Sequence, residues 1–144
     1  MTIVRDMLNG KPKGTWTIGP DATVFDALKL LEEKDVGALL VVEEGRLVGI
    51  FSERDYARKG ILHGRASKDT PVRDITTAKV YYITPEKSLE ECLALMTDKH
   101  IRHLPVLEEG KLIGVVSIGD AVKAMIADLE FTVQHLENYI TGGG

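Results

Sequence analysis

A segment of 13 residues occurs twice in this chain, and this internal repeat constrains the fold more than any other feature of the sequence. Residues 43–55 have the sequence EEGRLVGIFSERD, and residues 108–120 have the sequence EEGKLIGVVSIGD. Corresponding residues are separated by a constant 65 positions. The repeat indicates that the chain has two similar halves. Because one half is too small to close a hydrophobic core, we predict that the two halves pack together around one core.

Each copy of the repeat ends where a short apolar strand is followed by Ser-x-x-Asp. We call Ser52 to Asp55 the first corner and Ser117 to Asp120 the second corner. A serine with an acidic residue three positions later is a typical start of a helix, in which the serine caps the first turn. The sequence therefore predicts a strand-to-helix junction at both corners, and we expect the functional chemistry to lie there.

Each half is predicted to contain a strand, a helix, two strands and a second helix. Turn residues and hydrophobic periodicity place these elements. They are extended segments at 15–18 and 80–83, helices capped by Thr23 and Ser88, hairpins starting near 36 and 101, and second helices from Asp55 to about Ile61 and from Asp120 onward. The predicted fold class is α+β, built from two α/β-type repeats with an extended C-terminal helix.

The segment before each half is also repeated, with a different spacing. Val-Arg-Asp occurs at 4–6 and again at 72–74, an offset of 68. Three extra residues therefore lie in the first connection, the loop predicted at 9–14. We predict a first unit at 1–65, a second at 66–127, and a helical extension with a Gly-Gly-Gly tail at 128–144.

The C-terminal helix, predicted from about 120 to 140, carries an apolar stripe with alternating spacings of four and three residues. The stripe is formed by Val122, Ile126, Leu129, Val133, Leu136 and Ile140. This spacing is typical of a helix that packs against a partner helix, although it lasts for fewer than three heptads. We therefore predict a homodimer, and the alternative is that the stripe packs back on its own domain.

Composition argues against several classes of function. Of the 144 residues, 44% are hydrophobic and 28% are charged, which is ordinary for a globular domain. The net charge of −4, with no Lys/Arg run longer than two, gives no basic surface for nucleic acid or an anionic membrane. The chain has one cysteine and no N-terminal apolar stretch like a signal peptide, so the expected location is the cytoplasm.

No catalytic or metal site is predicted. Cys92 lies on the apolar stripe of a predicted helix, which favours a role in packing. The four histidines lie in different elements without zinc-site spacing, and Gly-Val-Val-Ser-Ile-Gly lacks the Gly-x-Ser-x-Gly pattern of a nucleophile elbow. We therefore predict that the protein is not an enzyme.

The duplicated pattern resembles a pair of cystathionine β-synthase (CBS) domains, the arrangement called a Bateman module. The resemblance rests on Gly-x-x-Ser-x-x-Asp in both halves and on His-Leu-Pro-Val at 103–106, and it covers about residues 3–126. It implies two βαββα units with pseudo-two-fold symmetry and two clefts that bind AMP, ADP, ATP, NAD or S-adenosylmethionine. Such modules usually regulate an enzyme or transporter, so we expect an unidentified partner protein here.

The two corners suit a ribose better than a phosphate. A helix N-terminus attracts phosphate, but Asp55 or Asp120 in the first turn would repel it. A carboxylate there has acceptor oxygens for the two hydroxyls of a ribose. Ser52 and Ser117 either add a hydroxyl contact or only cap the helix.

The resemblance implies that phosphate contacts come from Arg102 and His103 at the start of a hairpin strand of the second half, where related adenylate-binding modules are expected to carry basic residues. Their equivalents in the first half are Gly37 and Ala38, so the two clefts are predicted to differ. Arg54 is a further candidate for a phosphate contact across the pseudo-two-fold axis. The alternative for Arg102 and Arg54 is that they are ordinary exposed surface residues, and the alternative for His103 is that it has a structural role.

The resemblance places the adenine base near the first strand of each half, against Ile18, Ile83, Tyr82 and Thr84. We expect a regulatory module that requires no cofactor and binds an adenosine nucleotide as its ligand, AMP first and NAD or ATP next. The alternative is a scaffold or dimerisation module that binds no ligand.

Overall fold

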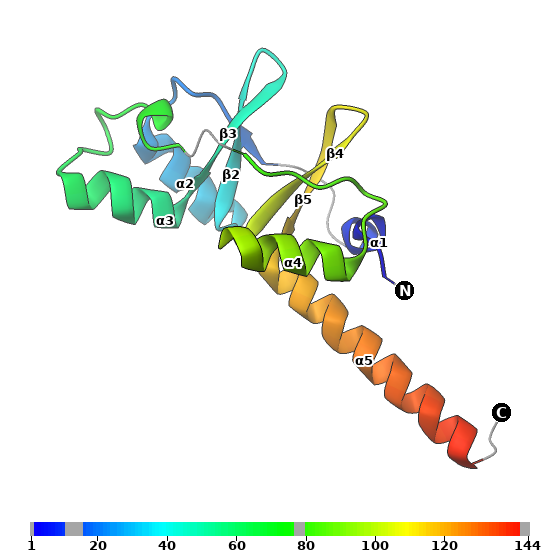
Figure 1. The fold of residues 1–144 in the computed structure, drawn as a ribbon. Helices are drawn as coiled ribbons and strands as arrows, with labels where there is room; N and C mark the ends of the chain where they lie inside the picture. The colour runs from blue at the N-terminus through cyan, green and yellow to red at the C-terminus, as the bar shows by residue number, and fades with distance from the viewer. Residues whose placement is uncertain (1, 11–15, 77–79, 142–144) are drawn as a thin grey trace. The chain divides into compact units, whose positions relative to one another are not determined.

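The computed structural model describes residues 2–10, 16–76 and 80–141, and it contains two repeats of mixed helix and strand (Figure 1). Most of the predicted loop at 9–14, Thr15 and the terminal glycine triplet lie outside the described residues. The chain divides into two compact units. One consists of residues 14–81, and the other consists of residues 1–13 together with 82–144.

The unit of residues 14–81 contains the first repeat. Its main elements are β1 (Thr17–Ile18), α2 (Val24–Lys34), β2 (Ala38–Glu43) and β3 (Arg46–Ser52). The three strands form one sheet in the order β1-β2-β3, with β1 parallel and β3 antiparallel to β2. Helix α2 begins as predicted, because the Thr23 hydroxyl accepts a hydrogen bond from the Asp26 N–H at 3.1 Å.

The other unit contains the second repeat. Its main elements are α4 (Leu89–Lys99), β4 (His103–Glu108), β5 (Lys111–Ser117) and α5 (Ile118–Thr141). Strands β4 and β5 pair antiparallel, in a register equivalent to that of β2 and β3. Figure 1 shows α5 as one continuous helix that extends beyond α4.

Both hairpins use the predicted Glu-Glu-Gly turns. Glu44 and Gly45 have φ values of 50° and 78°, and Glu109 and Gly110 have values of 51° and 78°. Positive φ at both central residues is the geometry of a tight two-residue turn whose twist matches that of the strands. Glycine at the second position adopts this geometry without steric cost.

The strand predicted at 80–83 is reduced to a single bridge between Ile83 and Val106. In the first repeat, the Leu40 N–H donates to the Trp16 carbonyl at 3.0 Å and extends the pairing of β1 with β2. The residue equivalent to Leu40 is Pro105, which has no N–H to donate. The proline therefore explains why the ladder is shorter in the second repeat.

The second helix of the first repeat reaches Ile61 as predicted, but only its first turn is α-helical. It consists of α3 (Glu53–Asp55), the π-helical η1 (Tyr56–Gly60) and the 3₁₀ turn η2 (Ile61–His63). Gly60 lies against the Tyr56 ring, since a Cβ there would lie 3.0 Å from the Tyr56 Cδ1. The equivalent of Tyr56 is Ala121 in the regular helix α5.

The Val-Arg-Asp segment at 4–6 packs on the second repeat, and the one at 72–74 packs on the first repeat. In α1 (Val4–Asn9), the Val4 and Arg5 N–H groups donate to the carbonyls of Lys87 and Pro85 at 2.8 and 2.9 Å. In η3 (Val72–Asp74), the equivalent N–H groups donate to Ala22 and Pro20 at 2.8 and 3.0 Å. The predicted boundary at 65/66 follows the sequence repeat, whereas the compact units exchange these two segments.

The exchanged segments complete the hydrophobic cores. Val72 and Ile75 are fully buried in one cluster with α2, β2 and β3, and Val4 and Met7 are the equivalent buried residues of the other unit. Gly114 on β5 makes room for α1, because a Cβ at this position would lie 2.7 Å from the Leu8 Cδ2. The glycine of the second Gly-x-x-Ser-x-x-Asp motif therefore has a packing role.

Candidate functional site

The second corner is a closed capping box. The Ser117 N–H donates to the Asp120 Oδ2 at 2.8 Å, and the Asp120 N–H donates to the Ser117 Oγ at 3.1 Å. Both residues are half-buried. The reciprocal bonds fix the Asp120 carboxylate at the first turn of α5, where the backbone N–H groups favour a negative charge.

Arg102 and His103 lie beside this corner. His103 is paired with Ser117 across the β4–β5 hairpin, and the Ile118 N–H donates to the Arg102 carbonyl at 2.8 Å. Arg102 is exposed and His103 is half-buried. The two basic residues predicted to contact phosphate and the carboxylate predicted to bind ribose are thus at the same end of one hairpin.

Tyr82, Ile83 and Thr84 belong to the same unit as the second corner. Ile83 is buried, and its N–H and carbonyl are both used in hydrogen bonds of 3.0 Å with Pro105 and Leu107. Tyr82 and Thr84 are exposed. Contact with a base would therefore come mainly from Tyr82 and Thr84, while Ile83 holds this segment against β4.

Cys92 is fully buried in α4, as predicted. Burial, and to a smaller extent the negative charge of Asp120, raises the pKa of the Cys92 thiol to about 11. A thiol with this pKa is protonated at neutral pH. Cys92 therefore has a packing role under the second corner.

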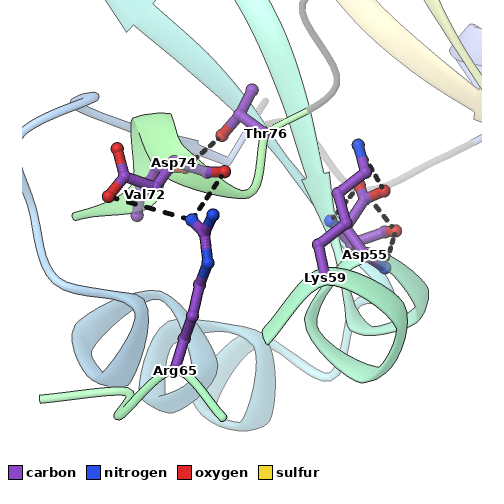
Figure 2. Close-up of polar contacts among 7 residues, drawn as sticks. Asp55, Lys59, Arg65, Val72, Asp74 and Thr76 are labelled. Atoms are coloured by element: carbon purple, nitrogen blue, oxygen red, sulfur yellow. Dashed lines mark hydrogen bonds and ion pairs between the residues drawn. The ribbon is translucent and has the colours of Figure 1, made fainter. Parts of the chain in front are cut away.

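The first corner has the same capping box and an additional cation. The Asp55 Oδ2 accepts from the Ser52 N–H at 3.2 Å and from the Ser52 hydroxyl at 3.1 Å, and the Asp55 N–H donates to the Ser52 Oγ at 3.1 Å. Lys59 Nζ lies 3.7 Å from the Asp55 Oδ1. Figure 2 shows Lys59 reaching back to this carboxylate from the following turn.

Lys59 was not among the predicted site residues. An acidic and a basic residue at i and i+4 on a helix are neighbours, so the spacing of Asp55 and Lys59 was the signal that could have revealed the pair. The equivalent position in the second repeat is Ala124, which carries no charge. The two repeats therefore differ in charge at this helix position, as well as in the residues of the adjacent strand.

The strand beside the first corner has the same backbone geometry as its counterpart. Ala38 is paired with Ser52, and the Glu53 N–H donates to the Gly37 carbonyl at 3.3 Å. Ile18 is half-buried against the core of this unit. The backbone geometry is repeated, whereas the basic side chains of Arg102 and His103 are replaced by Gly37 and Ala38 in the first repeat.

Arg54 is exposed on α3 and belongs to the unit of the first repeat. Its predicted contact with a phosphate across the pseudo-two-fold axis stays a prediction. In the same unit, Arg65 contacts Asp74 through a 3.2 Å hydrogen bond to its carbonyl and a 3.9 Å ion pair, and the Thr76 hydroxyl donates to the Val72 carbonyl at 2.7 Å (Figure 2). These contacts hold the segment that follows the first repeat.

The sequence matches the pattern of the CBS domain twice, at residues 4–61 and 72–127. These two matches cover most of the chain. The chain belongs to the CBS-domain family. The predicted resemblance and the predicted fold of two repeats with a C-terminal helix are both confirmed.

Relatives and solved structures agree with this assignment. The Arabidopsis thaliana CBS domain-containing protein CBSX3, named as mitochondrial, is 44% identical over an alignment of 151 positions, which covers 99% of this chain and 73% of that protein. A solved protein with CBS domains from Burkholderia ambifaria is 52% identical with a TM-score of 0.86, and the match covers 88% of this chain and 96% of that chain.

A more distant structure contains bound ligands. The CBS domain pair of the protein MJ0100, solved in complex with 5′-methylthioadenosine and S-adenosyl-L-methionine, is 23% identical with a TM-score of 0.77. The match covers 89% of this chain and 97% of that chain. At this identity the likeness shows the shared fold. CBS domain pairs are regulatory modules, and this is the level of function that membership of the family supports.

Within residues 2–10, 16–76 and 80–141, no three His, Cys, Asp or Glu side chains are grouped so that they could hold a metal ion. Over the same ranges, no helix combines the length and the apolar character needed to cross a membrane.

Proposed function

We propose that this CBS domain pair is a regulatory module that binds an adenosine nucleotide at the second corner and transmits the bound state to a partner protein. The observation that carries the proposal is the placement of Asp120, Arg102 and His103 at one end of the β4–β5 hairpin. An anionic acceptor and basic side chains together suit a ligand that has both a sugar and a phosphate.

The ribose is assigned to Asp120. A carboxylate has about four acceptor positions and accepts from the hydroxyls of a ribose as it does from the Ser117 N–H. The capping box holds the carboxylate in place before the ligand arrives, which lowers the entropic cost of binding. The Ser117 hydroxyl accepts from the Asp120 N–H, so its main role is capping.

The phosphate is assigned to Arg102, with His103 as a second contact. Arg102 is exposed at the hairpin end, and its guanidinium offers several donors in the fork geometry that fits phosphate. Gly37 and Ala38 cannot supply these contacts in the first repeat. AMP is the ligand we expect first, and NAD and ATP follow because they share its adenosine and phosphate groups.

The first corner is proposed to be the weaker site for a nucleotide. Lys59 already lies 3.7 Å from the Asp55 carboxylate, and a ribose would compete with this ion pair. Ser52 donates its hydroxyl to the same carboxylate. Because Gly37 and Ala38 stand in place of Arg102 and His103, the first corner would prefer a ligand with fewer charges, such as adenosine.

The MJ0100 complex supports the class of ligand, because it shows that the CBS fold accommodates adenosine-containing molecules. We further propose that the protein acts without catalysis and as a homodimer. The cytoplasm remains our proposed location on sequence grounds, and the mitochondrial relative makes the mitochondrion the alternative to test.

A thermal-shift panel tests the proposal. The chain is heated with AMP, ADP, ATP, NAD, S-adenosylmethionine and, as a control, inosine monophosphate at equal concentration. A ligand present at 100 times its Kd stabilises the folded protein by about 2.7 kcal/mol, which corresponds to a rise in Tm of roughly 8 °C for a chain of this size. We expect AMP to raise the Tm, and the Arg102→Ala variant to lose most of that rise.

An unchanged Tm with every adenosine ligand would reject the proposal and favour the alternative function, a scaffold that binds no ligand. The observation that favours the scaffold is the row of exposed apolar side chains along α5, which needs no nucleotide to act. The panel separates the two functions because AMP would not stabilise a scaffold. A scaffold that self-associates would instead become more stable as the protein concentration rises.

A further inference from the structure

Residues 58–68 concentrate positive charge, and we call them the basic segment. They include four lysine or arginine residues and one histidine but no aspartate or glutamate, so their formal charge is +4. The whole chain has a charge of −4, so the rest of the chain carries −8. The positions 65 further along, 123–133, carry −1. The repeat therefore does not impose the basic character of this segment.

Most of the basic segment lies outside the sequence pattern that defines the CBS fold. The first match to that pattern ends at residue 61, and the second begins at residue 72. The residues between the two matches connect the repeats. The charge of the segment is therefore not explained by the requirements of the shared fold.

Two large apolar side chains lie in the middle of the basic segment. Ile61 and Leu62, both in η2, are 58% and 76% exposed. They are the most exposed large apolar side chains described in the unit of residues 14–81. Single exposed apolar residues are common, but grouped ones mark interaction surfaces. The basic segment therefore combines an exposed apolar centre with flanking cations.

The backbone of the basic segment is held by hydrogen bonds near both ends. The Arg65 N–H donates to the Gly60 carbonyl at 3.0 Å, and the Phe25 N–H of α2 donates to the Ser67 carbonyl at 2.9 Å. Between these bonds, Gly64 has a φ of 69°, which glycine adopts without steric cost. A surface whose backbone is already ordered loses less conformational entropy when a partner binds.

The unit neutralises only part of the charge of the basic segment. Lys59 and Arg65 each lie near one aspartate of the same unit, at N–O distances of 3.7 and 3.9 Å (Figure 2). Arg58 and Lys68 are exposed, and neither forms an ion pair within the part of the chain that the structure describes. The Lys68 ammonium lies 5.1 Å from the centre of the Phe25 ring, which is itself 38% exposed.

We propose that the basic segment is the docking surface for an acidic segment of a partner protein that also carries apolar side chains. Carboxylates of the partner would face Arg58 and Lys68, because complementary charges attract and orient the partner. Its apolar side chains would cover Ile61 and Leu62. Nucleic acid is disfavoured because its bases stack on aromatic side chains, which this centre lacks. A membrane is disfavoured because one short turn has far less apolar surface than a membrane-binding helix.

Fluorescence anisotropy without any nucleotide tests this surface. The probe is a labelled peptide in which Glu-Glu-Leu-Leu is repeated four times, and two further peptides replace either leucine by serine or glutamate by lysine. We expect the chain to bind the Glu/Leu peptide, to bind the Glu/Ser peptide more weakly and not to bind the Lys/Leu peptide. The affinity for the Glu/Leu peptide should fall as the salt concentration rises.

Variants at exposed positions locate the binding. Arg58→Glu/Lys68→Glu should weaken the Glu/Leu peptide about tenfold or more, because like charges would then face each other. Leu62→Ser should weaken it roughly 5- to 20-fold, because an apolar contact is lost. The matched control is Arg46→Glu/Lys111→Glu, which changes the net charge equally at exposed positions at the starts of β3 and β5 and should bind nearly as the unmodified chain does.

Three results would overturn the proposal. The first is that the unmodified chain does not bind the Glu/Leu peptide. The second is that the control pair weakens binding as much as Arg58→Glu/Lys68→Glu does. The third is that a poly-dT oligonucleotide binds more tightly than the peptide and equally well to Leu62→Ser, which would show a general polyanion surface. No adenosine ligand is present, so failure of the proposed nucleotide site would leave this test unaffected.

Discussion

The contact between Leu8 and Gly114 provides a test of the segment exchange. A Cβ added at Gly114 would lie 2.7 Å from the Leu8 Cδ2, 3.3 Å from its Cδ1 and 3.5 Å from its Cγ. Carbon atoms in contact prefer about 3.5–4.0 Å, so the new methyl group would overlap two atoms of the leucine. We expect Gly114→Ala to destabilise the protein by about 1–3 kcal/mol, the usual cost of overpacking.

A double-mutant cycle separates this contact from other effects of the substitution. Leu8→Ala alone removes a half-buried side chain and should cost roughly 1–2.5 kcal/mol, less than the 2–5 kcal/mol of a fully buried site. Leu8→Ala also removes the atoms that the new Cβ meets. We therefore expect the double variant to be no less stable than Leu8→Ala, with a coupling of about 1–3 kcal/mol.

Urea unfolding followed by far-UV circular dichroism measures the three variants. Gly19→Ala is the control, because a Cβ there has no neighbour within 4 Å and the substitution should be neutral or slightly stabilising. If the effects of Leu8→Ala and Gly114→Ala are additive, the two residues are not in contact. That result would contradict the packing of α1 on β5, and with it the exchange of the Val-Arg-Asp segments.

Two further predictions concern charge. Arg102→Ala should weaken the binding of AMP by about 1–3 kcal/mol and leave the binding of adenosine nearly unchanged, and this difference should shrink in high salt. If calorimetry shows equal losses of binding free energy for AMP and adenosine, Arg102 shapes the site without contacting phosphate. Burial raises the pKa of Cys92 in the folded protein to about 11, whereas a thiol in the unfolded chain has a pKa near 8.5. The contribution of the protonated thiol to the free energy of unfolding is therefore complete below about pH 8.5 and is lost as the pH rises toward 11. The stability difference between the unmodified chain and Cys92→Ala should therefore narrow above pH 9, by up to about 1.4 kcal/mol per pH unit, and parallel urea-midpoint curves for the two proteins would contradict this.

Local sequence signals were sufficient for much of the fold. The caps at Thr23 and Ser88, the turns at Glu44 and Glu109 and the long C-terminal helix were predictable because each depends on residues close together in the chain. The capping boxes at the two corners were predictable for the same reason.

The features that the sequence did not predict depend on contacts between distant segments. The strand at 80–83 was predicted from its apolar residues, but Pro105 cannot donate the hydrogen bond that would extend it. The π-helical turn after Asp55 depends on how Tyr56 and Gly60 pack. The exchange of Val4 and Val72 between the units was not predictable, because the repeat shows that these two residues are equivalent but does not show which repeat each of them packs on.

The backbone geometry around the two corners was predictable to a similar extent. The pairing of His103 with Ser117 follows from the hairpin register, which the Glu-Glu-Gly turn sets. The buried state of Ile83 did not follow from its place in a short apolar segment, because it depends on pairing with Val106. The assignment of individual residues such as Ile18, Ser52 and Asp120 to ligand contacts stays a prediction until ligand binding is measured.

The most direct test of the proposed function is a calorimetric titration of AMP into the unmodified chain and into Asp120→Asn. Asparagine keeps an oxygen that can accept the Ser117 N–H, so the capping box is retained while the charge is lost. Asp55→Asn is the matched control at the first corner.

Replacing a charge-assisted hydrogen bond with a neutral one costs about 1–2 kcal/mol, so AMP should bind the unmodified chain with a micromolar Kd and bind Asp120→Asn roughly 5- to 30-fold more weakly. Asp55→Asn should change the Kd much less. If AMP binds Asp120→Asn as tightly as the unmodified chain, or does not bind the unmodified chain, the second corner is not a nucleotide site.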